Sequence, residues 1–145
     1  MPNPSIHILR ASLKPRLYRD IEIESDASLA KLAGAIVRAF DFDMDHAYGF
    51  FSKLTGNVYQ SPVKYELFAD ADVGRASRSV KRTTVAQAFT SVGSKMLLLY
   101  DYGDEWRFKV EVIGLGEKAA TVRYPKVAAK VGDAPEQYPD ADDED

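Results

Sequence analysis

The fold is decided by the stretch of residues 94–114, which reads SKMLLLYDYGDEWRFKVEVIG. Residues 96–100 are apolar throughout, as expected for a strand that is covered on both faces. Over residues 106–112 apolar and polar side chains alternate, which is typical of a strand with one face in water. Between the two runs, Gly103 is predicted to supply the positive φ of a tight reversal, and the flanking aspartates to accept hydrogen bonds from backbone amides. The stretch therefore predicts a β-hairpin.

Upstream of this hairpin, residues 6–13 and 17–23 form two β-leaning runs that are joined across Pro15, which favours a turn. Arg19 shares one face of the second run with three aliphatic residues. Ser28 is a predicted N-cap, and the apolar residues after it recur at helical spacing up to Phe40. We therefore expect an N-terminal hairpin followed by an amphipathic helix. The predicted fold class is α+β, a mainly antiparallel sheet with a packed amphipathic helix and a β-grasp-like N-terminal half.

The other predicted elements are short. They are a strand over residues 47–51, an edge strand over 59–68 that Pro62 interrupts, a polar surface loop over 69–82, a short helix at the Thr84/Gln87 capping box, and a strand over 121–124. Trp106 is predicted to pack in the core rather than line a ligand groove.

Composition narrows the classes of function. The chain has 145 residues, of which 46% are hydrophobic, enough for one domain, predicted over residues 1–134. Residues 135–145 are rich in proline and acidic residues and are expected to be disordered. The net charge of −3 gives no general reason to expect nucleic acid or membrane as a partner, and the absence of cysteine excludes thiolate chemistry. No apolar run suits a membrane span or signal peptide, so a cytoplasmic location in a prokaryotic cell is expected.

Three groups of residues are candidates for chemistry. Asp101, Asp104 and Glu105 could act as acids or bases or bind a hard cation, although turns favour aspartate for backbone reasons alone. His46 stands among acids; a metal site would need Asp43 or Asp45 beside it, and a histidine hydrogen-bonded in the interior is favoured instead. The third group is basic and could contact phosphates, although such side chains are usually only solvated; it comprises Arg75, Arg78, Lys81 and Arg82. No phosphate-binding loop, nucleophile elbow or zinc-binding helix is present.

The hairpin also resembles a known family. Residues 100–106, YDYGDEW, resemble the Tyr-Asp-Phe-Gly-Asp-x-Trp signature of the plasmid pRiA4b ORF-3-like family, also described as an insertion-element passenger domain of TnpR-like fold. PRLYR at residues 15–19 is similar to its Pro-x-Ile-Trp-Arg, and the order of later landmarks also agrees. The family commonly has cysteines near its C-terminus and a helical histidine, where this chain has no cysteine and has Ala33. The resemblance implies a compact α+β domain and little about activity.

The residues thus favour a non-enzymatic binding module without a cofactor or metal, whose partner is a protein or a small polar ligand. The candidate surface is the mouth of the central hairpin, with acidic and aromatic groups that suit a cationic or polar partner; it comprises Arg19, His46, Asp101, Tyr102, Asp104 and Glu105. One alternative is a nucleic-acid-associated accessory protein of a mobile element that uses the basic loop. Another is a hydrolase built on His46 and nearby carboxylates. A recombinase is rejected, because the chain is not basic and shows no clear helix-turn-helix.

Overall fold

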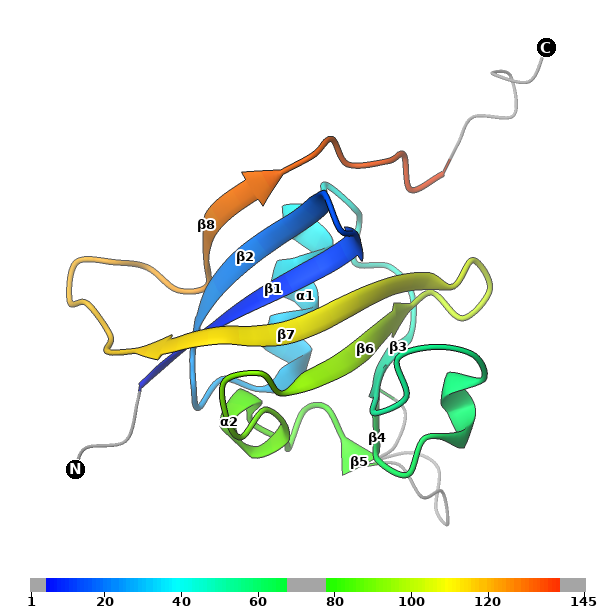
Figure 1. The fold of residues 1–145 in the computed structure, drawn as a ribbon, viewed down its shortest axis with the longest axis horizontal. Coiled ribbons are helices and arrows are strands. Elements are labelled where there is room, and N and C mark those ends of the chain that lie inside the picture. Colours follow the sequence, from blue (N-terminus) through cyan, green and yellow to red (C-terminus); the bar gives the residue numbers. More distant parts are fainter. Residues whose placement is uncertain (1–4, 68–77, 139–145) are drawn as a thin grey trace.

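A computed structural model describes residues 5–67 and 78–138, and within them the chain forms one eight-stranded sheet (Figure 1). The strand order is β5-β4-β3-β6-β7-β1-β2-β8, and every pairing is antiparallel except that of β4 with β5. The elements are β1 (Ile6–Lys14), β2 (Leu17–Glu24), α1 (Leu29–Ala39), β3 (Tyr48–Phe51), a 3₁₀ turn (Val58–Gln60), β4 (Lys64–Glu66), β5 (Arg78–Ser79), α2 (Val85–Ala88), β6 (Lys95–Tyr100), β7 (Trp106–Gly116) and β8 (Lys126–Val131).

The central hairpin is confirmed as β6 and β7, at the middle of the sheet. Residues 96–100 are buried on both faces, and the alternation along β7 buries Phe108, Val110 and Val112. The predicted role of Gly103 is wrong, because Asp101 (φ 67°) and Glu105 (φ 54°) carry the positive φ of the turn. Aspartate tolerates this conformation, and the Asp101 carboxylate accepts hydrogen bonds from the backbone N–H groups of residues 103 and 104 at 3.0 and 3.3 Å.

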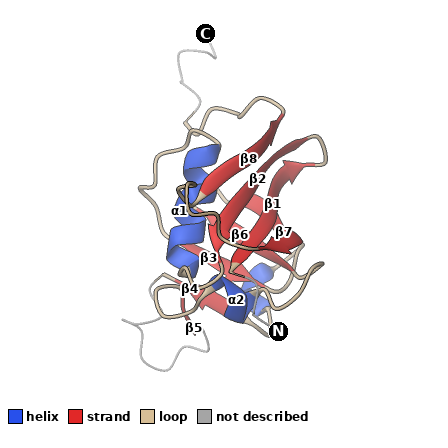
Figure 2. Ribbon diagram, turned by 90° about the vertical axis from the view of Figure 1, so that its left-hand side faces the viewer, coloured by secondary structure: helices blue, strands red, loops and turns tan. Residues whose placement is uncertain are grey.

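The N-terminal hairpin and its helix are also confirmed. β1 pairs with β2 across the predicted turn, and the Ser28 hydroxyl accepts a hydrogen bond from the Lys31 N–H at 3.1 Å. α1 lies along one face of the sheet (Figure 2) and buries the side chains that recur at helical spacing, which are Leu29, Leu32, Ala33, Ile36 and Val37. The Thr84/Gln87 capping box is present at α2. Strong local periodicity and capping therefore located these elements correctly.

The predicted α+β class is nevertheless wrong, because the fold is mostly β. In the part of the chain that the structure describes, two helices of 11 and 4 residues accompany eight strands in a mixed sheet. The β-grasp-like description of the N-terminal half fails as well, since β1 and β2 are interior strands flanked by β7 and β8. The sequence underestimated the sheet because β4, β5 and β8 are edge or near-edge strands that carry little alternation.

The C-terminal strand shows this error most clearly. The predicted strand over residues 121–124 is absent, and β8 instead begins directly after Pro125 at Lys126. Its sequence, KVAAKV, does not alternate, and most of its side chains are exposed. Of the strand predicted over residues 59–68, Lys64–Glu66 is the part that forms within the described residues, after the 3₁₀ turn, and residue 68 lies outside them.

The core lies between α1 and the inner face of the sheet. An aromatic row crosses it, in which the ring centroid of Phe108 lies 5.0 Å from that of Phe40 and 6.3 Å from that of Phe42. Trp106 continues the row at 4.8 Å from Phe42, which confirms that it packs against the core. None of the helices in the described ranges is long and apolar enough to cross a membrane.

Candidate functional site

One group of polar side chains gathers where β6 ends, and we call it the His46 cluster; it comprises Asp45, His46, Tyr100, Asp101 and Tyr138. Its members come from the loop between α1 and β3, from the end of β6 and the following turn, and from the chain after β8. The central hairpin therefore supplies the base of the site, and two distant segments complete it.

Tyr100 holds the loop between α1 and β3 in place. This residue is fully buried, and its hydroxyl oxygen accepts hydrogen bonds from the backbone N–H groups of Asp45 (2.8 Å) and His46 (3.2 Å). The same hydroxyl donates to the Asp43 carbonyl oxygen. A single buried phenol thus satisfies three backbone groups of a loop that has no regular structure, and it fixes where the side chains of Asp45 and His46 lie.

Carboxylates surround the exposed imidazole. The His46 Nε2 atom lies 3.4 Å from Asp101 Oδ2 and 3.5 Å from Asp45 Oδ1, and it also contacts the Tyr138 hydroxyl. The His46 side chain is 37% exposed, so the predicted interior histidine is wrong. Because Asp101 is buried while Asp45 is half-exposed, Asp45 is the carboxylate of the cluster that solvent reaches more readily.

The electrostatics of the cluster keep Asp45 charged. Partial burial raises the pKa of Asp45, but hydrogen bonds from Tyr138 and Tyr100 and the nearby His46 outweigh it, so that the net shift is downward. Burial and the Asp45 carboxylate raise the pKa of Tyr138 to about 12. At neutral pH the cluster therefore presents an ionised carboxylate whose phenol neighbours remain hydrogen-bond donors.

The chain after β8 closes the site. The Gln137 side chain is buried and pairs with the backbone of Asp43, accepting from its N–H at 2.7 Å and donating to its carbonyl oxygen at 3.1 Å. Next to it, the Tyr138 hydroxyl donates to Asp45 Oδ1 at 3.0 Å. These residues lie within the predicted tail of residues 135–145, of which 139–145 fall outside the described residues.

An open depression of about 480 Å³ adjoins the cluster. It is lined by Met44, Asp45, His46, Ala47, Tyr48 and Leu67. Burial alone raises the pKa of Tyr48 to about 12, so its hydroxyl is also a donor at neutral pH. The depression thus offers apolar contacts beside the charged edge of the cluster.

Of the predicted surface at the hairpin mouth, the structure brings together only His46 and Asp101. Tyr102 lies on the other side of the sheet, where its hydroxyl donates to Glu66 at 3.3 Å and its ring packs 5.8 Å from Tyr59. Glu105 pairs with Arg107 at 3.0 Å, and the Asp104 side chain is exposed. The β6–β7 turn separates these residues because its side chains point to opposite faces of the sheet.

Arg19 is absent from the site. It is fully buried between β2 and the end of α1, where its guanidinium donates to three backbone carbonyl oxygens. Of the predicted basic group, Arg75 lies outside the described residues, whereas Arg78, Lys81 and Arg82 are exposed in or after β5. Sequence reasoning missed Tyr100, Gln137 and Tyr138 as site residues. Tyr100 carried no polar signal because its run is otherwise apolar, and the other two stand in a segment whose composition suggested disorder.

Within residues 5–67 and 78–138, no group of three or more histidine, aspartate or glutamate side chains is arranged to hold a metal ion. The proximity of Asp45 to His46 therefore does not amount to the metal site that the sequence left open.

The raised pKa values of Tyr48 and Tyr138 predict that these two phenols ionise at a higher pH than an ordinary tyrosine. A phenol whose folded pKa lies above its ordinary value of 10.0 contributes stability below about pH 10, and this contribution is lost as the pH rises toward 12. Of the eight tyrosines, Tyr48 and Tyr138 should still be protonated at about pH 11 in the folded protein, as followed by tyrosinate absorbance. Tyr138→Phe should remove one late group, and urea-unfolded protein should show none. An unchanged late amplitude in Tyr138→Phe would contradict the hydrogen bond to Asp45.

Comparison with solved structures finds the same fold in MM3350, a protein of unknown function from Methanosarcina mazei Go1. The two chains superpose with a TM-score of 0.71 and 23% sequence identity, over 86% of this chain and 68% of that one. No curated protein sequence matches the chain. Residues 5–139, which include the central hairpin and every member of the His46 cluster, match the sequence model described as plasmid pRiA4b ORF-3-like protein. The chain therefore belongs to the plasmid pRiA4b ORF-3-like family.

Proposed function

We propose that this protein is a non-enzymatic binding module and that the His46 cluster binds a cationic group of its partner, either a protein side chain or a small polar molecule. The observation that carries the proposal is the half-exposed Asp45 carboxylate, which accepts a hydrogen bond from the Tyr138 hydroxyl, sits on a loop that Tyr100 fixes through the backbone, and stays ionised. A carboxylate that is fixed before binding loses little side-chain freedom when a cation arrives.

The neighbours of Asp45 favour a cation over an anion. A second carboxylate, that of Asp101, lies 3.4 Å from the His46 imidazole, and the Tyr138 ring centroid lies 5.8 Å from that of His46. Carboxylates together with aromatic faces suit guanidinium and ammonium groups, which pair with the former and pack on the latter. The apolar lining of the adjacent depression, from Met44 and Leu67, would accommodate the aliphatic stem of such a group.

A hydrolase remains the second candidate, because the loop does bring His46 beside two carboxylates. Binding is favoured over it since Nε2 already faces Asp45, Asp101 and Tyr138, and no serine or threonine hydroxyl within residues 5–67 and 78–138 contacts the ring. We also propose a cytoplasmic protein of a prokaryotic mobile element, in keeping with the plasmid in the family description.

The proposal is tested by nuclear magnetic resonance, with N-acetyl-arginine amide titrated into the ¹⁵N-labelled chain. We expect saturable shifts at the backbone amides of residues 44–48 and 101. Asp45→Asn should weaken binding about tenfold. The matched control is Asp104→Asn, which removes the same charge from an exposed turn position that lies outside the cluster.

Further outcomes distinguish a cation-binding site at Asp45 from the alternatives. N-acetyl-glutamate amide should leave the same amides unshifted, since its charge is opposite. Equal weakening by Asp104→Asn, or shifts confined to other parts of the chain, would show that the effect is general electrostatics rather than a site. Shifts at residues 78–82 with duplex DNA, falling steeply with salt, would instead favour the nucleic-acid alternative.

A further inference from the structure

The sheet has one long free edge in the part of the chain that the structure describes. β8 ends the strand order and is 6 residues long, whereas β5 at the opposite edge has only 2 (Figure 1). The outer side of an edge strand carries N–H and C=O groups that no neighbouring strand satisfies, and these can pair with another extended chain. β8 therefore offers a backbone template on which a further strand can form.

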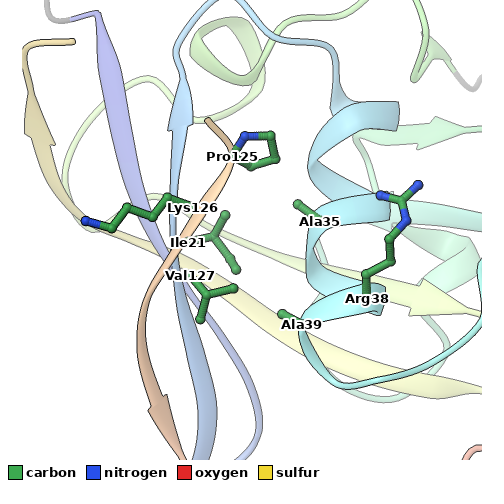
Figure 3. Close-up of a pocket in the computed structure, with 7 residues that line it drawn as sticks. All are labelled: Ile21, Ala35, Arg38, Ala39, Pro125, Lys126 and Val127. Carbon is green, nitrogen blue, oxygen red and sulfur yellow. The ribbon is translucent and has the colours of Figure 1, made fainter. Parts of the chain in front are cut away.

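A groove runs beside this edge, between β8 and α1. The cavity there has a volume of about 280 Å³, and Ile21 and Val127 face Ala35 and Ala39 across it (Figure 3). Val127 is 46% exposed, so the groove is open to solvent. A strand added to β8 would point alternate side chains toward α1, and an apolar one among them would fill the groove.

The surroundings of the groove are basic. Lys126 and Lys130 lie on β8 and are exposed, and Arg38 lies on the helix at the groove rim. None of these three cations forms an ion pair with the described residues. In a chain of net charge −3, exposed and unpaired lysines on a free sheet edge are complementary to an acidic partner, and Lys126, which points away from the groove (Figure 3), would meet the side chains on the other face of an added strand. These lysines also disfavour a second copy of this chain, because pairing two β8 strands would gather four lysines.

We propose that the outer edge of β8 binds an extended, acidic segment of a partner protein, which adds to the sheet as a further strand with an apolar side chain in the groove. This surface and its partner are separate from the His46 cluster, which presents the opposite charge.

The test is a selection of random displayed peptides about eight residues long on the immobilised full chain. Peptides that combine acidic and apolar residues should be enriched, and they should shift the amides of residues 126–131 in ¹⁵N spectra. Charge reversal on the edge, Lys126→Glu with Lys130→Glu, should weaken an enriched peptide at least about tenfold in fluorescence anisotropy. The matched control is Lys31→Glu with Lys109→Glu, which reverses two exposed charges on α1 and β7 and should bind like the wild type.

Several results would overturn the proposal. One is a selection that enriches no peptide, and another is a set of binders whose shifts lie away from β8 and α1. Equal loss of affinity in the control variant would reduce the effect to net charge. A dimer in light scattering that Val131→Lys dissociates would assign the edge to a second copy instead.

Discussion

Replacing Arg19 by alanine is expected to lower the free energy of unfolding by about 3–5 kcal/mol, the range of large changes at buried sites. The guanidinium donates from Nε to the Ala39 carbonyl oxygen at 3.0 Å, and from Nη1 to those of Tyr18 (2.9 Å) and Val131 (3.0 Å). Its Cζ atom also lies 4.6 Å from the Phe40 ring centroid. One side chain therefore joins β2, β8 and the end of α1, where the helix dipole favours a cation. Urea unfolding followed by the single tryptophan, Trp106, measures the loss.

One further variant separates the contribution of hydrogen bonding from that of packing, and a second serves as a control. Arg19→Met keeps much of the buried volume but leaves the three carbonyl groups without their donor, so a loss of about 1–3 kcal/mol is expected. Arg10→Ala removes an arginine from the neighbouring strand, where its guanidinium pairs with Asp20 at 2.8 Å on the open face; about 1 kcal/mol or less is expected. Hydrogen exchange should also become faster along β8 in both Arg19 variants. An Arg19→Ala protein as stable as Arg10→Ala would refute the role assigned to Arg19.

Arg19 also shows how far the sequence could be interpreted. Its position on the aliphatic face of β2 is predicted correctly, but its inclusion in the candidate binding surface is wrong, since it is fully buried, which is rare for an arginine. Only the ends of α1 and β8 reveal its acceptors, and Ala39 and Val131 lie 20 and 112 residues away in sequence. The buried Nη2 atom has no partner in the described residues, an arrangement that no local pattern would suggest.

Across the whole fold, too, local patterns were predicted from the sequence and long-range contacts were not. The elements β1, β2, α1 and β7, which have period-two or helical periodicity, and β6, which is a continuous apolar run, were located because their burial pattern is local. β8 was missed because its residues are exposed and its strand identity depends on pairing with β2. The mostly β class was misjudged for the same reason, since the strands that complete the sheet are the least periodic.

Some contacts of the candidate site could likewise be predicted from the sequence, and others could not. His46 and Asp101 were predicted to be neighbours, and they are, because both flank apolar runs that pair as β3 and β6. Tyr138 reaches the site from a segment 92 residues beyond His46, where the pairing of Gln137 with Asp43 and its own hydrogen bond to Asp45 hold it. Sequence composition alone gives no information on such a contact.

Phe108→Ala is the other substitution with a large expected effect, a loss of about 3–5 kcal/mol in the free energy of unfolding. Phe108 is fully buried on β7 at the centre of the aromatic row, between Phe40 and Phe42. Alanine would remove contacts with both rings and leave a cavity that the paired strands on either side cannot close, because β7 is hydrogen-bonded to β6 and β1. Urea unfolding measured by far-ultraviolet circular dichroism is the appropriate readout, since Trp106 emission would itself change.

Ile113→Ala on the same strand is the matched control, because it also truncates a large apolar side chain, but one that is 38% exposed. A loss within about 0.5 kcal/mol is expected for it. For Phe108→Leu the loss in the free energy of unfolding should lie between those of the other two variants, at about 1.5 kcal/mol, because leucine fills part of the space. If Phe108→Ala and Ile113→Ala destabilise the chain equally, the aromatic row does not make the contribution to stability that is assigned to it here.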